Sequence, residues 1–184
     1  MQIVETKELT KRYGASTVVN QVSLSVPEGS VYGFIGHNGA GKSTLMNILI
    51  GLYQPTEGKI FLNGQAVRID SPSQAVKLGI GMVHQHFMLV QPFTVTENIV
   101  LGTEPRKGIV LDMAEARKNV EEISERYGLF IDPDAKIEDI SVGMQQRVEI
   151  LKALYRCADI LILDEPTSSL TPQEIEDLIG IMRN

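Results

Sequence analysis

Residues 36–44 form a glycine-rich stretch whose composition suits the binding of phosphate groups. Glycines at 36, 39 and 41 let the backbone curl so that successive N–H groups can point at one anion. Lys42 supplies a mobile cation for the outer phosphates of a nucleotide, and the Ser43 hydroxyl is a suitable ligand for Mg²⁺. The residues that we expect to contact the nucleotide here are Gly36, Asn38, Gly39, Ala40, Gly41, Lys42, Ser43 and Thr44.

Two acids, Asp164 and Glu165, directly follow the apolar run Ile160–Leu163. In a parallel sheet, ligands bind beside the carboxyl ends of the strands. We expect Asp164 to hold Mg²⁺ through water and Glu165 to polarise the water that attacks the γ-phosphate. The alternative is that both acids only make a strand end soluble. The phosphate loop needs a carboxylate on the metal side and therefore favours the catalytic interpretation.

The elements around the loop support this interpretation. An apolar run of buried-strand length, 31–35, precedes the loop, and apolar residues at helical spacing follow it up to Gly51. A glycine-rich turn that matched G-x-x-x-x-G-K-[ST] by chance would lack this strand–loop–helix context. Alternation over 22–26 predicts a further strand, and 58–64 predicts a strand that ends in an Asn-Gly hairpin turn.

The middle of the chain is predicted to be helical. Asp112, followed three residues later by Glu115, predicts a helix start, and a second helix should begin near Ser141. We expect Pro172 in the first turn of a closing helix and Cys157 to be buried and inert. The apolar stripes that should face the core are Met113, Ala116, Val120, Ile123 and Tyr127 in the first helix, and Met144, Val148, Leu151 and Tyr155 in the second.

Composition limits the classes of partner. The 184 residues have a net charge of -6, which argues against a nucleic-acid partner. A single cysteine excludes a disulfide framework, and no apolar run approaches the length of a membrane-spanning helix. The first residues also lack the pattern of a signal peptide. We therefore expect any link to a membrane to go through a partner.

Residues 140–150, Ile-Ser-Val-Gly-Met-Gln-Gln-Arg-Val-Glu-Ile, resemble the signature of the ABC ATPases, usually Leu-Ser-Gly-Gly-Gln followed by Gln-Gln-Arg-Val. The resemblance covers essentially the whole chain in the family's order, and 94–98 resembles the family's usual entry to the helical lobe. It implies that Ser141 and Gly143 close over the γ-phosphate bound by a second cassette. It also implies roles for Tyr13 (stacking on adenine), Gln85 (metal contact and junction with the helical lobe), Asp164 and Glu165 (metal-side and catalytic acids), and Ser168, Ser169 and Leu170 (contact with the partner cassette).

The fold that the resemblance implies is α/β. It has a P-loop NTPase core with a mostly parallel sheet, an amino-terminal antiparallel β region and a helical signature subdomain. We expect one ABC ATPase domain over 1–184, with 1–85 and 157–184 in the core and about 86–156 in the helical subdomain. The family's switch histidine lies well beyond the catalytic acid, but only 19 residues follow Glu165 and the last histidine is His86. The domain is therefore expected to be incomplete at its carboxyl end, with hydrolysis weaker than nucleotide binding.

The signature departs from the common form at Ile140, Val142 and Met144, but Ser141 and Gly143 are kept. This variant resembles the ATPases of nucleoside and simple-sugar importers, and the first of their two tandem cassettes more than the second. The resemblance implies ATP and Mg²⁺ as cofactors, a second cassette and transmembrane permease subunits as partners, and a peripheral place on the cytoplasmic face of the plasma membrane.

Two alternatives remain beside a transport ATPase. One is a nucleotide-binding module without turnover, because the switch histidine is absent from this chain. The other is a cassette of DNA repair, chromosome maintenance or translation. Cassettes of DNA repair and chromosome maintenance have coiled coils or DNA-binding additions between the glutamine and the signature, whereas the interval from Gln85 to Ser141 is short and has neither extended heptads nor a basic patch.

Overall fold

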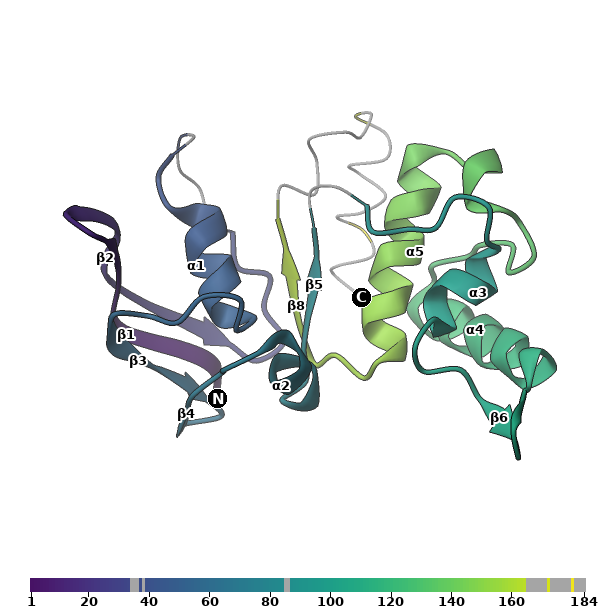
Figure 1. Cartoon of the computed structure of the whole chain (residues 1–184), viewed down its shortest axis with the longest axis horizontal. Coiled ribbons are helices and arrows are strands. Elements are labelled where there is room, and N and C mark those ends of the chain that lie inside the picture. The colour runs from purple at the N-terminus through teal and green to yellow at the C-terminus, as the bar shows by residue number, and fades with distance from the viewer. Residues whose placement is uncertain (34–36, 38, 85–86, 165–171, 173–179, 181–184) are drawn as a thin grey trace. The chain divides into compact units, whose positions relative to one another are not determined.

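The structure is a computed structural model of the 184-residue chain. It describes residues 1–33, 37, 39–84, 87–164, 172 and 180 (Figure 1). The chain divides into two compact units, Met1–Ile80 and Gly81–Asn184. The division into a core and a helical subdomain near residues 86 and 156 stays a prediction.

The first unit is built on an antiparallel sheet in the order β2-β1-β3-β4. Thr6 in the central strand faces Leu24 on one side and Ile60 on the other. The predicted Asn63-Gly64 hairpin turn is confirmed, because both residues have the positive φ angles, 50° and 77°, that a type I′ turn needs. The strands are β1 (Gln2–Tyr13), β2 (Ser16–Pro27), β3 (Glu57–Leu62) and β4 (Gln65–Val67).

Helix α1 (Lys42–Leu49) follows the glycine-rich loop, as predicted. Its apolar side is buried through Leu45, Ile48 and Leu49, and α1 contacts β2. A short helix, α2 (Pro72–Lys77), completes the unit, with Ser71 capping its amino end. The hydrophobic pattern after the loop therefore predicted both the helix and its buried face.

The predicted buried strand over 31–35 is not found in its described part. Residues 31–33 have no regular secondary structure, and the side chains of Val31 and Tyr32 are 62% and 51% exposed. An apolar run becomes a buried strand only when neighbouring strands and helices cover it. Within the described part of the chain, no strand pairs with these three residues, which explains their exposure. Residues 34 and 35 lie outside the described residues.

The second unit contains three packed helices, α3 (Val95–Val100), α4 (Met113–Tyr127) and α5 (Val142–Tyr155), which contact one another (Figure 1). A two-stranded ribbon, β6 (Arg106–Lys107) and β7 (Val110–Leu111), precedes α4, and a short 3₁₀ turn, Ile137–Asp139, precedes α5. Both predicted helix starts are confirmed, because the side chains of Asp112 and Ser141 accept backbone N–H groups in the first turns of α4 and α5. The core that these helices enclose includes Val95, Ile99, Ala116, Val120, Leu129, Ile137, Val148 and Leu151.

The predicted apolar stripe of α4 is buried only in its middle. Ala116 and Val120 are fully buried, whereas Met113 and Tyr127 at the two ends are each 37% exposed. Ser124, which the pattern did not include, is buried, and its hydroxyl donates to the carbonyl oxygen of Leu129 at 2.9 Å. Periodicity identified the inward face, but the length of that face depends on how far the neighbouring elements extend.

Strands β5 (Ile80–Val83) and β8 (Ile160–Leu163) pair with each other (Figure 1). The N–H of Asp164, just past β8, donates to the carbonyl oxygen of Val83 at the end of β5. Gly81, near the start of β5, lies against Ala158 and Leu161 near the start of β8. Like ends therefore lie together and the two strands run parallel, as expected for the core sheet of an α/β fold.

The expectation that Cys157 is buried was wrong, because this residue is exposed. Cys157 follows the C-cap of α5 with φ 61°, and this left-handed conformation turns the chain out of the helix. Within the described ranges, none of the helices is long and apolar enough to cross a bilayer.

Candidate functional site

In the described part of the phosphate loop, two glycines before α1 have a left-handed backbone conformation. Gly39 and Gly41 have φ angles of 83° and 81°, values that glycine adopts without a steric penalty. Between them, the N–H of Ala40 donates to the carbonyl oxygen of His37 at 3.1 Å. A Cβ atom on Gly41 would collide with the carbonyl oxygen of Val18 in β2. Gly41 is therefore required both for its conformation and for its close approach to the sheet, while Gly36 and Asn38 lie outside the described residues.

The amino end of α1 differs from those of the other described α-helices. Side chains of Ser71, Thr94, Asp112 and Ser141 accept backbone N–H groups at the starts of α2, α3, α4 and α5. The N-cap of α1 is Gly41, and no side chain caps this helix. The first-turn N–H groups of an α-helix have no carbonyl partner within the helix, and the helix dipole adds positive potential there. An anion is the natural ligand for such an end.

The predicted ligand residues lie in this first turn. Lys42 and Thr44 are half-buried, and Ser43 is exposed. Loop backbone, ammonium group and hydroxyls thus come from one short segment, which suits a chain of phosphates. The hydroxyl of Ser43 in the first unit and the carboxylate of Asp164 in the second are each hard oxygen donors of the kind that Mg²⁺ prefers.

The acids at the end of β8 are described only in part. Asp164 is half-buried, and its backbone is fixed by the hydrogen bond to Val83 at 3.1 Å. Glu165 and Gln85 lie outside the described residues, as do Ser168, Ser169 and Leu170. The parallel pairing of β5 and β8 does establish that Asp164 follows a sheet strand at its carboxyl end, where ligands of α/β folds bind.

Side chains from α3 and α5 hold the segment 87–90, which begins two residues after Gln85. The N–H of Met88 donates to Oε1 of buried Glu149 at 2.7 Å, and Nζ of Lys152 donates to the carbonyl oxygen of Met88 at 3.0 Å. The fully buried side chain of Asn98 binds both backbone groups of Val90. Its Oδ1 accepts the N–H of Val90 at 2.7 Å, and its Nδ2 donates to the carbonyl oxygen of Val90 at 3.1 Å. The backbone after the predicted glutamine is therefore anchored to the same helix that begins at the signature.

The signature segment forms the amino end of α5. The Ser141 hydroxyl accepts the N–H of Met144 at 3.3 Å, and Ser141 itself is exposed. Nε2 of Gln145 donates to the carbonyl oxygens of Ile137 and Ile140 and so ties the helix start to the preceding 3₁₀ turn. Gly143 is half-buried in the first turn. The Ser141 hydroxyl is thus a helix cap that also stays accessible to a ligand.

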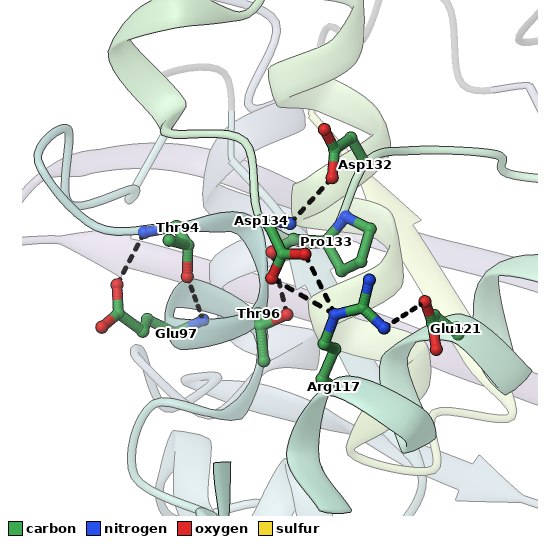
Figure 2. A network of polar contacts seen from close by, with 8 residues as sticks. All are labelled: Thr94, Thr96, Glu97, Arg117, Glu121, Asp132, Pro133 and Asp134. Carbon is green, nitrogen blue, oxygen red and sulfur yellow. Dashed lines mark hydrogen bonds and ion pairs between the residues drawn. The ribbon is translucent and has the colours of Figure 1, made fainter. Parts of the chain in front are cut away.

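A polar network connects the starts of α3 and α4 with the loop 131–135 (Figure 2). Thr94 and Glu97 form a reciprocal capping box, and the Thr96 hydroxyl donates to the carbonyl oxygen of Pro133 at 2.9 Å. Arg117 pairs with Asp134 at 3.0 Å and with Glu121 at 2.7 Å, and its hydrogen bond to Asp134 raises the pKa of the guanidinium. Because these ion pairs are exposed, their role is to fix geometry rather than to stabilise the fold strongly.

Tyr13, the predicted adenine contact, is the last residue of β1 and is 47% exposed. Its ring lies edge-on to that of Tyr53, with centroids 6.2 Å apart, and the ammonium of Lys11 lies over it at 5.1 Å. The sequence reasoning missed Lys11, Tyr53 and Glu149. Lys11 stands two residues from Tyr13 and could have been suspected, but the other two contacts join residues 40 and 61 positions apart and have no local pattern.

The structure therefore gathers the predicted residues in two groups. The first unit holds Tyr13 and the loop residues Gly39, Ala40, Gly41, Lys42, Ser43 and Thr44. The second unit holds Asp164 and the signature residues Ser141 and Gly143.

Comparisons with known proteins show what the whole chain is similar to. Residues 19–168 match the family model described as ABC transporter. The chain is 59% identical over 182 residues to the nucleoside import ATP-binding protein NupA of Lactococcus lactis, covering 99% of this chain and 36% of that protein. It is 56% identical, with the same coverage, to the guanosine import ATP-binding protein NupO of Bacillus subtilis. The chain thus spans little more than a third of the length of these curated relatives.

The fold is also that of a solved protein. The crystal structure of the ADP conformation of MJ1267, an ATP-binding cassette of an ABC transporter, superposes with a TM-score of 0.87 at 27% sequence identity. The match covers 100% of this chain and 76% of that one. The antiparallel sheet, the loop before α1 and the helices of the second unit therefore have counterparts in a known nucleotide-binding fold.

Proposed function

Because this chain belongs to the ABC transporter family, we propose that it binds Mg-ATP and forms part of an ATPase that energises an importer. The observation that supports this most directly is the amino end of α1. Gly41 replaces a capping side chain there, and Lys42 and Ser43 occupy the first turn. This arrangement suits a nucleoside triphosphate, since backbone N–H groups, a cation and a hydroxyl can all reach its phosphates.

In the proposed site each residue has a separate task. Gly36, Asn38, Gly39, Ala40 and Gly41 shape the loop backbone, Lys42 neutralises the outer phosphates, and Tyr13 stacks on the adenine. Ser43, Gln85 and Asp164 would hold Mg²⁺, which supplies charge neutralisation at the phosphates when it is bound. Glu165 would accept a proton from the attacking water as general base. Thr44 continues the helix turn that receives the phosphates.

The second half of the site comes from another cassette in this proposal. Ser141 and Gly143 lie at an exposed helix start, where they can approach the γ-phosphate bound by a partner cassette. Transmembrane permease subunits would be the other partners and would hold the protein at the cytoplasmic face of the membrane. The relatives in the comparisons are named as import proteins, which supports uptake as the direction of transport.

Nucleosides are the proposed solute class, with simple sugars as the second candidate. The support is that two relatives more than half identical to this chain are named nucleoside and guanosine import ATP-binding proteins. An uptake assay tests the proposal. Cells that express the full protein with its permease partners should take up labelled nucleosides, and Lys42→Ala should reduce that uptake to the background of cells without the protein. Uptake of simple sugars alone would reassign the solute. Nucleoside uptake that persists in the Lys42→Ala cells would contradict the proposed function.

A further inference from the structure

Tyr13 is held by a short segment that has no assigned role, the turn 53–56 between α1 and β3. The ring of Tyr53 meets that of Tyr13 at an interplanar angle of 86°, and the centroids are 6.2 Å apart. An edge-to-face pair of this kind is directional, so it restricts the orientation of both rings. Tyr13 and Tyr53 remain 47% and 42% exposed, which leaves ring surface available to a ligand.

Lys11 adds a second restraint on the same ring. Its ammonium lies 5.1 Å from the Tyr13 centroid and donates to the carbonyl oxygen of Gln54 at 2.6 Å. One face of the Tyr13 ring is therefore covered by a cation that the turn itself fixes in place. In this arrangement a purine base would stack on the opposite face.

The turn is bound to β1 through its backbone as well. The N–H of Thr56 donates to the carbonyl oxygen of Thr10 at 2.8 Å, and the N–H of Arg12 donates to the Thr56 hydroxyl at 3.1 Å. Arg12 also pairs with Glu57 at 3.3 Å. The last residues of β1, just before Tyr13, are thus held to the turn by hydrogen bonds and to the start of β3 by an ion pair.

At its other end the turn is continuous with α1. The N–H groups of Leu52 and Tyr53 both donate to the carbonyl oxygen of Asn47 in the last turn of that helix. The first turn of α1 contains Lys42 and Ser43. One covalent segment therefore joins the proposed phosphate contacts to the residue that orients Tyr13, and all of it lies in the first unit.

We propose that Tyr53, with Lys11, is a positioning residue that orients the Tyr13 ring for stacking on the adenine of a bound nucleotide. The inference rests on the proposed function, because it assumes that ATP binds at the phosphate loop. The turn that follows α1 would then set the orientation of the adenine contact in addition to joining α1 to β3.

The test is equilibrium binding of Mg-ATP and of Mg-tripolyphosphate, which lacks the nucleoside, to the chain and its variants. Tyr53→Leu removes the ring and should weaken ATP binding roughly three- to tenfold, the range expected for loss of one aromatic pair. Tripolyphosphate binding should not change, and Tyr53→Phe, which keeps the ring, should restore ATP binding. Tyr127→Leu, which changes a similarly exposed tyrosine on α4, is the matched control and should bind both ligands normally.

A double-mutant cycle separates positioning from general damage to the fold. In a Tyr13→Leu background, Tyr53→Leu should cause no further loss of ATP affinity, because the ring that it orients is gone. An equal loss of ATP and tripolyphosphate, an unchanged ATP affinity, or additive effects in the cycle would each overturn the inference. Failure of the unmodified chain to bind either ligand would instead contradict the proposed function.

Discussion

Gly41→Ala is expected to lower the affinity for Mg-ATP at least about tenfold and to destabilise the fold by about 2 kcal/mol or more. Gly41 has φ 81°, which costs an L-residue about 1–2 kcal/mol, and its new Cβ would meet the Val18 carbonyl oxygen. Val18 lies in β2, and the next residue, Val19, is paired with Lys11 of β1. This pairing restrains β2 from moving away from the added Cβ atom. The start of α1 must shift instead, together with Lys42. Calorimetric titration with Mg-ATP and denaturant unfolding measure the two effects.

Gly128→Ala is the matched control for this prediction. Gly128 has φ 65° at the end of α4, and an added Cβ would meet nothing within 4 Å. The control therefore has the same backbone cost of about 1–2 kcal/mol without a collision. It should lose stability and keep its affinity for ATP. Normal ATP binding by Gly41→Ala would show that the loop geometry does not serve the nucleotide.

Glu165→Gln is expected to reduce ATP hydrolysis by about two to four orders of magnitude, the usual contribution of a general base. Glutamine has nearly the same shape but does not accept the proton of the attacking water. Mg-ATP binding should be retained, because the phosphate contacts come from residues 36–44. Phosphate release should be measured in the full protein, since the proposed site is completed by a second cassette.

Asp164→Asn separates the two acids when Mg-ATP binding is measured beside phosphate release. This variant should weaken Mg-ATP binding, because a metal-side carboxylate is lost, whereas Glu165→Gln should leave it intact. Turnover by Glu165→Gln near that of the unmodified protein would remove Glu165 from the proposed mechanism.

Local chemistry was predicted well from the sequence. Asn63 and Gly64 are residues that tolerate positive φ, and they form the expected hairpin turn. Asp112 and Ser141 cap the helices that were predicted to begin there, because a short polar side chain can accept the first-turn N–H groups. In each case the residues that determine the feature are neighbours in the chain.

Features that depend on distant residues were predicted poorly. The exposure of Val31 and Tyr32 reflects the neighbours of that run and not its own apolar composition. Contacts such as Tyr13 with Tyr53, or Glu149 with the Met88 N–H, join segments that only the fold brings together. The site residues themselves were predicted from motif and resemblance, and their roles stay predictions until they are measured.

The central claim is that the loop before α1 binds the phosphates of Mg-ATP. Isothermal titration of this chain with Mg-ATP, beside its Lys42→Ala variant, tests that claim most directly. Lys118→Ala, which removes an exposed lysine from α4, is the control for the loss of a positive charge. We predict saturable, Mg²⁺-dependent binding to the unmodified chain and to Lys118→Ala, and its loss in Lys42→Ala. Absence of saturable binding, or equal affinity in Lys42→Ala, would contradict the account.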